Sequence, residues 1–301
     1  MFIDLAIIIV NWNLKQDTCE CIDSLINAGA SLNQIITVDN GSTDDSITTL
    51  RNIYGSSLYI IEAEQNQGYA AGANLGIRYA LGQRYKWILL LNNDTTVAKD
   101  FISNMHQAAL SNQGFAIISP IILYHNKPSI IWYLGNHLIN KTLLTTSKYK
   151  NHKLEENLPP WIQIDFTNGC AMMISRAIFE QIGYLDEGLF MYGEEVDFCW
   201  RAKLTGFKFA CFTAARIWHK VSKSSQSDKP FARYLQIRNQ IIFYQRYSYN
   251  FQRYFYYIFT LLRTLIICIT DLLMLHTTLI SPTWQGWRDG WYKQQHPIGD
   301  Y

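Results

Sequence analysis

The sequence lacks the charge excess that is typical of nucleic-acid-binding proteins. Its 26 Lys and Arg residues nearly balance 24 Asp and Glu residues, and the net charge is only +2. We therefore expect no nucleic-acid partner. The 301 residues are 49 % hydrophobic and 17 % charged, without low-complexity tracts or repeats of solenoid period, which excludes a disordered chain and a solenoid.

Paired cysteine motifs are missing as well. The six cysteines show neither CxxC spacing nor the spacing of a disulfide framework, so we expect reduced thiols in a cytoplasmic protein. The first apolar run, residues 5–10, follows Asp4 and is too short for a signal peptide, so export is not expected. The phosphate-binding pattern G-x-G-x-x-G is also absent, which argues against a nucleotide-dependent oxidoreductase.

Short apolar runs alternate with helical patterns in the first third of the chain. We predict strands at residues 5–10, 34–38, 58–61 and 87–91, and helices at 18–28, 44–52 and 70–81, the second capped by Ser42 or Thr43. This alternation predicts an α/β fold whose central sheet is mostly parallel and flanked by helices. The polar and aromatic segment 124–161 is expected to form hairpins and loops.

Polar side chains follow three of the predicted strands. Asn11 and Asn13 follow the first strand, Asp39 the second, and Asn92, Asn93 and Asp94 the fourth. Open α/β sheets bind their ligands at the carboxyl ends of the strands, so these side chains are candidates for a binding site. A carboxylate such as Asp94 can also hold a divalent cation there, although each short motif alone is more often an ordinary turn.

Glycine recurs every four residues in the predicted helix that follows Asn66. Gly68, Gly72 and Gly76 place small residues on one face, where a backbone can approach a ligand or a neighbouring sheet closely. Close helix packing alone would explain the last two glycines. It explains Asn66 and Asn74 less well.

Two acids, Glu194 and Glu195, open a predicted helix that ends at Gly206. Acids in a first turn are often only partners of the helix dipole, and Asp197 can pair with Arg201. That explanation leaves the preceding aromatic run, residues 190–192, without a role, whereas an apolar wall for an acceptor would use it. His219 taken alone is more often a surface or core histidine than a ligand.

Five segments in order resemble glycosyltransferase family 2, and most closely its bacterial rhamnosyltransferase-like members. They are VDNGSTD, NQGYAAGAN, LLLNNDT, NGCAMMISRAIFEQIGYLDEGLFMYGEEVDFCWRAKLTGF and IWH, within residues 5–220. The resemblance implies the GT-A fold and inverting transfer of a sugar from a nucleotide. It also implies a base-binding Asp39, a DXD metal motif at 92–94, a catalytic base at Glu195 and a metal-binding His219. Asn92 replaces the first DXD acid, and Glu replaces the usual Asp at 195.

The resemblance divides the site residues by role. Donor binding is expected of Asn11, Asn13, Asp39, Asn66, Gly68, Asn74, Asn92 and Asn93; acceptor binding of Gly169, Tyr192 and Glu194; and binding of Mn²⁺ or Mg²⁺ of Asp94 and His219. We expect a catalytic domain at residues 1–225, with a nucleotide-binding half at 1–96 and an acceptor half at 97–225, followed by a helical region at 226–301.

The resemblance also implies a reaction. We expect transfer of rhamnose from dTDP-rhamnose to a polyprenyl-diphosphate-linked glycan in bacterial surface polysaccharide synthesis. A galactofuranosyl- or hexosyltransferase that uses a UDP-sugar is the alternative. A catalytically inactive membrane scaffold remains a further alternative.

Residues 255–280 form an almost entirely apolar stretch. Arg263 and Asp271 interrupt it, and each costs about 2.5 to 3.5 kcal/mol at a bilayer centre, which disfavours a plain transmembrane span. Polar residues recur about every seven positions, as in a helix that lies in a membrane interface. We assign a flanking aromatic and basic belt to Tyr254, Tyr256, Tyr257, Trp284, Trp287, Trp291, Arg233, Arg238, Arg246, Arg253, Arg288 and Lys293. A protein peripheral to the inner face of the cell membrane is expected; the alternatives are a buried hairpin and a homodimer contact.

Overall fold

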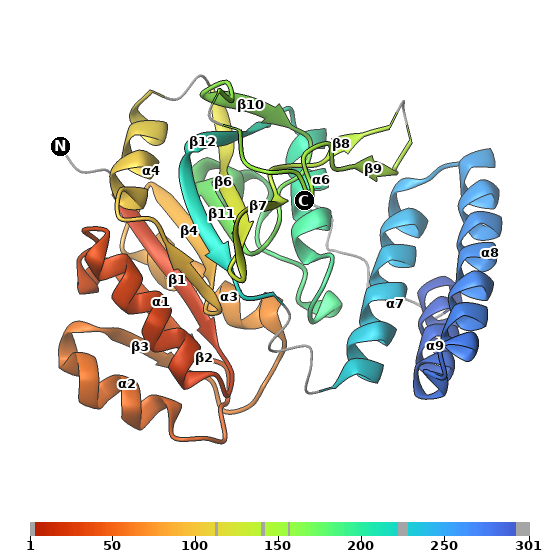
Figure 1. Ribbon diagram of the computed structural model, residues 1–301, viewed down its shortest axis with the longest axis horizontal. Coiled ribbons are helices and arrows are strands. Elements are labelled where there is room, and N and C mark those ends of the chain that lie inside the picture. The colour runs from red at the N-terminus through yellow and green to blue at the C-terminus, as the bar shows by residue number, and fades with distance from the viewer. Residues whose placement is uncertain (1–3, 112–113, 140–141, 156, 222–227, 293–301) are drawn as a thin grey trace.

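The computed structural model describes residues 4–111, 114–139, 142–155, 157–221 and 228–292. A large mixed sheet forms the centre of the molecule, with helices on both faces and a group of three C-terminal helices at one side (Figure 1). One core lies between the sheet and helices that contain Ala73, Ile178 and Phe198. The other core lies on the opposite face and contains Ile22, Leu50 and Phe101.

The ten strands of this sheet follow the order β10-β12-β6-β11-β4-β1-β2-β3, with β5 paired to β12 and β7 paired to β6. Their bounds are β1 (Leu5–Asn11), β2 (Ile35–Asp39), β3 (Tyr59–Glu62), β4 (Trp87–Asn92), β5 (Thr95–Val97), β6 (Phe115–Tyr124), β7 (Lys127–Tyr133), β10 (Trp161–Ile164), β11 (Ala171–Ser175) and β12 (Lys208–His219). The four N-terminal strands pair in parallel, which confirms the predicted strands and their arrangement. β11 is antiparallel to both of its neighbours, so the other half of the sheet is mixed.

The helices are α1 (Lys15–Asn27), α2 (Ser46–Tyr54), α3 (Tyr69–Gly82), α4 (Phe101–Leu110), α5 (Arg176–Ile182), α6 (Glu194–Leu204), α7 (Lys229–Tyr247), α8 (Phe251–Leu273) and α9 (Ile280–Tyr292). The predicted cap of α2 is wrong, because the helix begins only after Asp45. The Ser42 hydroxyl instead accepts the Asn13 N–H at 3.0 Å, and Asn13 Oδ1 accepts the Thr43 N–H at 2.7 Å. Both candidate caps therefore belong to a turn that is tied to the end of β1.

The segment between β6 and β10 forms hairpins, as predicted. β7 folds back antiparallel to β6, and β8 (His137–Leu138) pairs with β9 (Thr145–Thr146). The face of α3 that carries Gly72 and Gly76 packs directly on β1, because a Cβ at Gly76 would lie only 2.6 Å from Ile8 Cγ2. This close contact fixes the N-terminal end of α3 beside the carboxyl ends of β1 and β2.

Helix α8 has an inverted amphipathic pattern. Its polar Thr260, Thr264 and Asp271 are buried, at 3 %, 2 % and 6 % exposure. The face that is open carries Ile258, Leu262, Leu265, Ile266, Ile269, Leu272 and Leu273. We call these seven residues the α8 apolar face.

The predicted aromatic and basic belt is largely wrong. Trp287 and Trp291 are buried, and both indole N–H groups donate to Thr260 Oγ1 at 3.3 and 3.1 Å. Arg233 pairs with the buried Asp271 at 2.7 Å. Arg246 pairs with Asp186 and Asp197, Arg238 donates to Gly188 and Leu189, and Tyr256 is buried. Tyr254, Trp284 and Arg288 are exposed, and Lys293 lies outside the described residues.

Candidate active site

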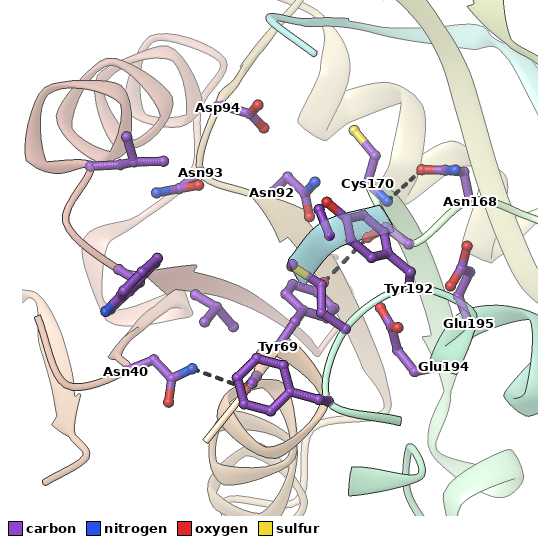
Figure 2. Close-up of a pocket in the computed structure, with 18 of the residues that line it drawn as sticks. Asn40, Tyr69, Asn92, Asn93, Asp94, Asn168, Cys170, Tyr192, Glu194 and Glu195 are labelled. Atoms are coloured by element: carbon purple, nitrogen blue, oxygen red, sulfur yellow. Dashed lines mark hydrogen bonds between the residues drawn. The ribbon is translucent and has the colours of Figure 1, made fainter. Parts of the chain in front are cut away.

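A pocket of about 440 Å³ opens at the carboxyl ends of β1 and β4, between the N-terminal ends of α3, α6 and α7. The predicted site residues that line it are Asn66, Gly68, Asn92, Asn93, Asp94, Gly169, Tyr192, Glu194, Glu195 and His219. Figure 2 shows that Asp94 and the two glutamates come from different sides of this pocket. Segments far apart in the sequence thus contribute to one cavity.

Four predicted donor residues do not line the pocket. Asp39 is fully buried, and its two carboxylate oxygens accept hydrogen bonds from Asn11 Nδ2 at 2.8 Å and from the Ser42 N–H at 2.9 Å. Asn13 holds the turn after β2, as described above. These three residues fix the loop beside the pocket, and their direct contact with a nucleotide base stays a prediction.

Asn74 is the fourth residue outside the pocket. Its side chain is fully buried and bonds to both backbone groups of Leu185, donating at 2.9 Å and accepting at 3.1 Å. It therefore ties α3 to the segment before the 3₁₀ turn Glu187–Leu189. The structure does not bring it to the cavity.

The pocket wall at Asn66 and Gly68 is held by Asn40, which the sequence analysis missed. Its Nδ2 donates to Gly68 O at 2.9 Å and to Asn66 Oδ1 at 3.1 Å. Gly68 has a φ of +89°, and a Cβ there would lie 2.4 Å from Phe190 O. Only glycine fits this close approach, so the loop before α3 directly touches the loop before α6.

Asp94 and His219 converge because β5 pairs antiparallel with β12, which places His219 opposite Thr95. Asp94 Oδ1 lies 3.0 Å from His219 Nε2, and both side chains are 7 % exposed. The imidazole ring of His219 packs against the ring of Trp132 in a T-shaped arrangement, with ring centroids 4.6 Å apart. The indole thereby fixes the orientation of the imidazole toward the pocket.

This pair fits part of a divalent metal site. Neighbouring ligands of an octahedral ion at about 2.1 Å lie roughly 3 Å apart, as the two donor atoms do. Within the described ranges, no group of three or more His, Cys, Asp and Glu side chains is placed to hold an ion. A cation here would need further ligands besides these two side chains.

Glu194 and Glu195 differ in their surroundings. The Glu195 side chain is partly exposed and accepts the Gly193 N–H on Oε2 at 3.1 Å. Glu194 is 5 % exposed, and its Oε2 is buried without a hydrogen-bond partner among the described residues. Gly169 packs against both, since a Cβ there would lie 3.5 Å from Glu195 Cβ and 3.9 Å from Glu194 Oε1.

Burial raises the pKa of both carboxyl groups. The pKa of Glu194 is raised well above its ordinary value by desolvation and then by the charge of Glu195. The pKa of Glu195 is also raised by desolvation, but backbone N–H groups, including that of Gly193, lower it in part. Of the two groups, Glu194 therefore has the stronger preference for its protonated form.

The sequence profile of Glycosyl transferase family 2 matches residues 6–183, which is more than half of the chain. The chain belongs to glycosyl transferase family 2. The matched range includes Asp39 and the motif at residues 92–94, and it ends before Glu194, Glu195 and His219. These three residues of the glycosyltransferase thus lie outside the matched region, but they line the same pocket as residues 92–94.

Two curated relatives cover most of this glycosyltransferase. The low-salt glycan biosynthesis hexosyltransferase Agl10 of Haloferax volcanii is 31 % identical over 250 residues, covering 80 % of this chain and 76 % of the relative. The dTDP-rhamnosyl transferase RfbF of Shigella flexneri is 24 % identical over 216 residues and covers 69 % of each chain.

The solved structures share the fold. The mannosyltransferase PcManGT of Pyrobaculum calidifontis, in complex with GDP-Man and Mn²⁺, superposes with a TM-score of 0.59 over 98 % of this chain and 89 % of its own. Sequence identity is only 11 %, so the likeness shows the fold alone. The expected GT-A fold is confirmed.

Several pocket residues escaped the sequence analysis. Trp12 stands between two residues that were selected, and Tyr69 directly follows Gly68, so both lay within recognised motifs. Trp132 comes from β7, and Phe231 and Gln236 come from α7, beyond any recognised motif. No local signal in the sequence marks these three, because only the tertiary structure brings their elements to the pocket.

Proposed function

We propose that this glycosyltransferase moves a sugar from a nucleoside diphosphate to a glycan hydroxyl in a single inverting displacement. The observation that carries the proposal is one pocket with a carboxylate pair on one side and an Asp–His pair on another. The new bond joins the acceptor oxygen to the anomeric carbon. The bond from that carbon to the diphosphate oxygen breaks, and the bonding electrons leave with the diphosphate.

Glu195 is proposed as the general base that takes the proton of the acceptor hydroxyl. Its carboxylate accepts the Gly193 N–H, which favours the ionised form and fixes its direction. Glu194, in its protonated form, would then donate a hydrogen bond to the acceptor. Tyr192 and Gly169 line the same part of the pocket, as an acceptor site requires.

Asp94 and His219 are proposed as the ligands of Mn²⁺ or Mg²⁺, and Asn92 and Asn93 lie directly beside them. A divalent cation at this position supplies positive charge that stabilises the departing diphosphate. Asn66 and Gly68 line the side of the pocket that is proposed to receive the nucleotide. Their positions are held by Asn40.

The proposed donor is dTDP-rhamnose. Similarity to a protein named dTDP-rhamnosyl transferase supports it, and so does the resemblance of the motifs to rhamnosyltransferase-like members. A UDP-galactofuranose or UDP-hexose donor is the second candidate, which similarity to a protein named hexosyltransferase favours. The two candidates predict different product masses.

The proposed acceptor is a polyprenyl-diphosphate-linked glycan at the inner face of the cell membrane. The α8 apolar face supports this location, because it leaves seven large aliphatic side chains open while Thr260, Thr264 and Asp271 on another side of the helix are buried. A contiguous apolar face of this kind marks a membrane or protein contact. A bilayer interface covers it without requiring a second protein, and the protein then lies close to a lipid-linked substrate.

The test is a transfer assay with the full-length protein, Mn²⁺ and vesicles that contain a polyprenyl-diphosphate-linked glycan. dTDP-rhamnose, UDP-galactofuranose and UDP-hexoses are supplied separately, and mass spectrometry identifies the lengthened glycan. We expect a rhamnose mass increase and an inverted anomeric centre by NMR, with Glu195→Gln as the inactive control. A product of retained configuration would refute the proposed displacement. Donor binding without transfer from any donor would favour the inactive scaffold.

A further inference from the structure

The loop that precedes the acid pair has an unusual backbone. Phe190, Tyr192 and Gly193 have φ angles of +65°, +69° and +89°. The two aromatic residues lack the freedom of glycine in this region, so each such conformation is strained. The surrounding structure must therefore hold residues 188–193 in place.

Two adjacent side chains of α7 supply most of that support. Asn239 is 3 % exposed, and its Nδ2 lies within hydrogen-bond distance of the backbone oxygens of Leu189 at 2.8 Å, Met191 at 2.9 Å and Tyr192 at 2.6 Å, so that its two N–H groups serve three acceptors. Arg238 donates to the oxygens of Gly188 and Leu189, both at 3.1 Å. Arg238 Nε also donates to Asn239 Oδ1 at 2.8 Å, which directs the amide N–H groups toward the loop.

The remaining carbonyls of the loop bond to the catalytic domain. Phe190 O accepts the Ala70 N–H at 3.2 Å, and Gly193 O accepts the Asp197 N–H at 2.9 Å. Every backbone oxygen from residue 188 to residue 193 therefore has a donor. Asn239 holds more of them than any other residue in this set.

The loop ends at the atom that contacts the proposed base. Its last residue, Gly193, donates its N–H to Glu195 Oε2 at 3.1 Å. The position of that N–H depends on the peptide between Tyr192 and Gly193, whose oxygen bonds to Asn239. The chain of contacts thus runs from α7 through one peptide group to the carboxylate.

We propose that Asn239 is a positioning residue for the transfer reaction, which holds the loop 188–193 so that the Gly193 N–H and the pocket walls present Glu195 to the acceptor. This inference rests on the proposed role of Glu195 as base. It gives α7 a part in catalysis without contact between Asn239 and the substrates.

The proposal predicts a change in pH dependence. The groups that interact electrostatically with Glu195 are Glu194 and Cys199 on α6, Tyr69 on α3 and Tyr133 on β7. None of these changes when Asn239 is replaced. Loss of the Gly193 N–H removes a bond that favours the ionised carboxylate, so the acidic limb of the rate profile should move to higher pH.

The test compares Asn239→Asp, which keeps the shape but removes donors, with Asn239→Ala, which leaves room for water. Ile241→Ala is the control, because Ile241 is buried on the same helix and packs against Gly290 of α9 instead of the loop. Deuterium uptake of the peptide that contains residues 188–196 is measured without ligand. Transfer from dTDP-rhamnose, or from whichever donor proves active, is measured across pH.

Both Asn239 variants should show faster uptake in the loop, a kcat lower by about 10- to 100-fold, a shifted acidic limb and a donor KM within threefold of the original. Ile241→Ala should keep the original loop uptake and acidic limb. Unchanged uptake and kcat would overturn the proposal, and so would faster uptake with an unchanged pH profile. Glu195→Gln is assayed in parallel: if it remains active, the assignment of the base fails independently of Asn239.

Discussion

Asp94 Oδ1 and His219 Nε2 lie 3.0 Å apart although the two residues are far apart in the sequence. A short strand, β5, begins directly after Asp94, and its pairing with the last residues of β12 brings the histidine back to the end of β4. The backbone N–H of Lys220 also donates to Asp94 O at 3.0 Å. The backbone on both sides of the pair is therefore fixed by hydrogen bonds.

Removing this pair should abolish turnover. We expect Asp94→Ala, and chelation of the unmodified protein with EDTA, to reduce transfer to background, while Mn²⁺ restores activity after chelation at least as well as Mg²⁺ because an imidazole ligand suits the softer ion. Turnover is measured as nucleotide release. Full activity in excess EDTA would refute the metal assignment.

Isosteric substitution by glutamine should affect activity differently at the two glutamates. We expect Glu195→Gln to lower kcat by roughly 10² to 10⁴-fold with little change in donor binding, because the amide keeps the size of the side chain but is no base. Glu194→Gln should keep substantial activity, since an amide N–H can replace the protonated acid as a donor. The opposite ranking in single-turnover assays would assign the base to Glu194.

Glu194 should also make stability depend on pH. Its pKa is raised in the fold above the ordinary value of 4.5, so its favourable contribution is complete below 4.5 and is lost as pH rises through the folded pKa. Glu194→Gln removes that loss. We therefore expect the variant to melt at a higher temperature than the original protein at pH 8 and to show no such advantage at pH 4. Calorimetry at both pH values checks this, and equal effects would contradict the buried acid.

The α8 apolar face should carry membrane binding. We expect Ile266→Glu with Ile269→Glu to remove the protein from anionic liposomes in flotation assays, because each buried isoleucine contributes about 1.5 to 3 kcal/mol. Ile53→Glu is the control, since Ile53 is 55 % exposed on α2. High salt should weaken attachment only in part.

Flotation combined with light scattering distinguishes membrane binding from a dimer contact at this face. An original protein that stays off liposomes and forms a dimer in light scattering, with Ile266→Glu producing a monomer, would establish the subunit contact instead. Substitutions are preferable to deletion of α8 and α9, because Gly286 and Gly290 of α9 pack closely on α7. Deletion would expose the helix that holds the loop before Glu195.

The sequence determined the parallel half of the sheet and the helices on it. Apolar runs of strand length, separated by amphipathic segments, have few alternatives, because they must bury both faces of the strands. It also indicated Asp94, the acids at the start of α6 and His219 as candidate site residues, because they stand in recognisable local motifs; the structure places them in one pocket, and their chemical roles stay predictions. The glycine face of α3 was readable for the same reason.

Only the tertiary structure determined whether a polar side chain faces the pocket or forms hydrogen bonds within the protein. Asp39 and Asn74 are of residue types that often bind ligands, but in the structure their buried side chains form hydrogen bonds to other groups of the protein. The heptad-like polar stripe of α8 suggested a wet surface, whereas Thr260 and Asp271 turn inward to partners on α9 and α7. The local pattern gives the spacing of such residues but does not specify their partners. Asn239 shows this most clearly, because its role depends on three carbonyls that are distant in the sequence.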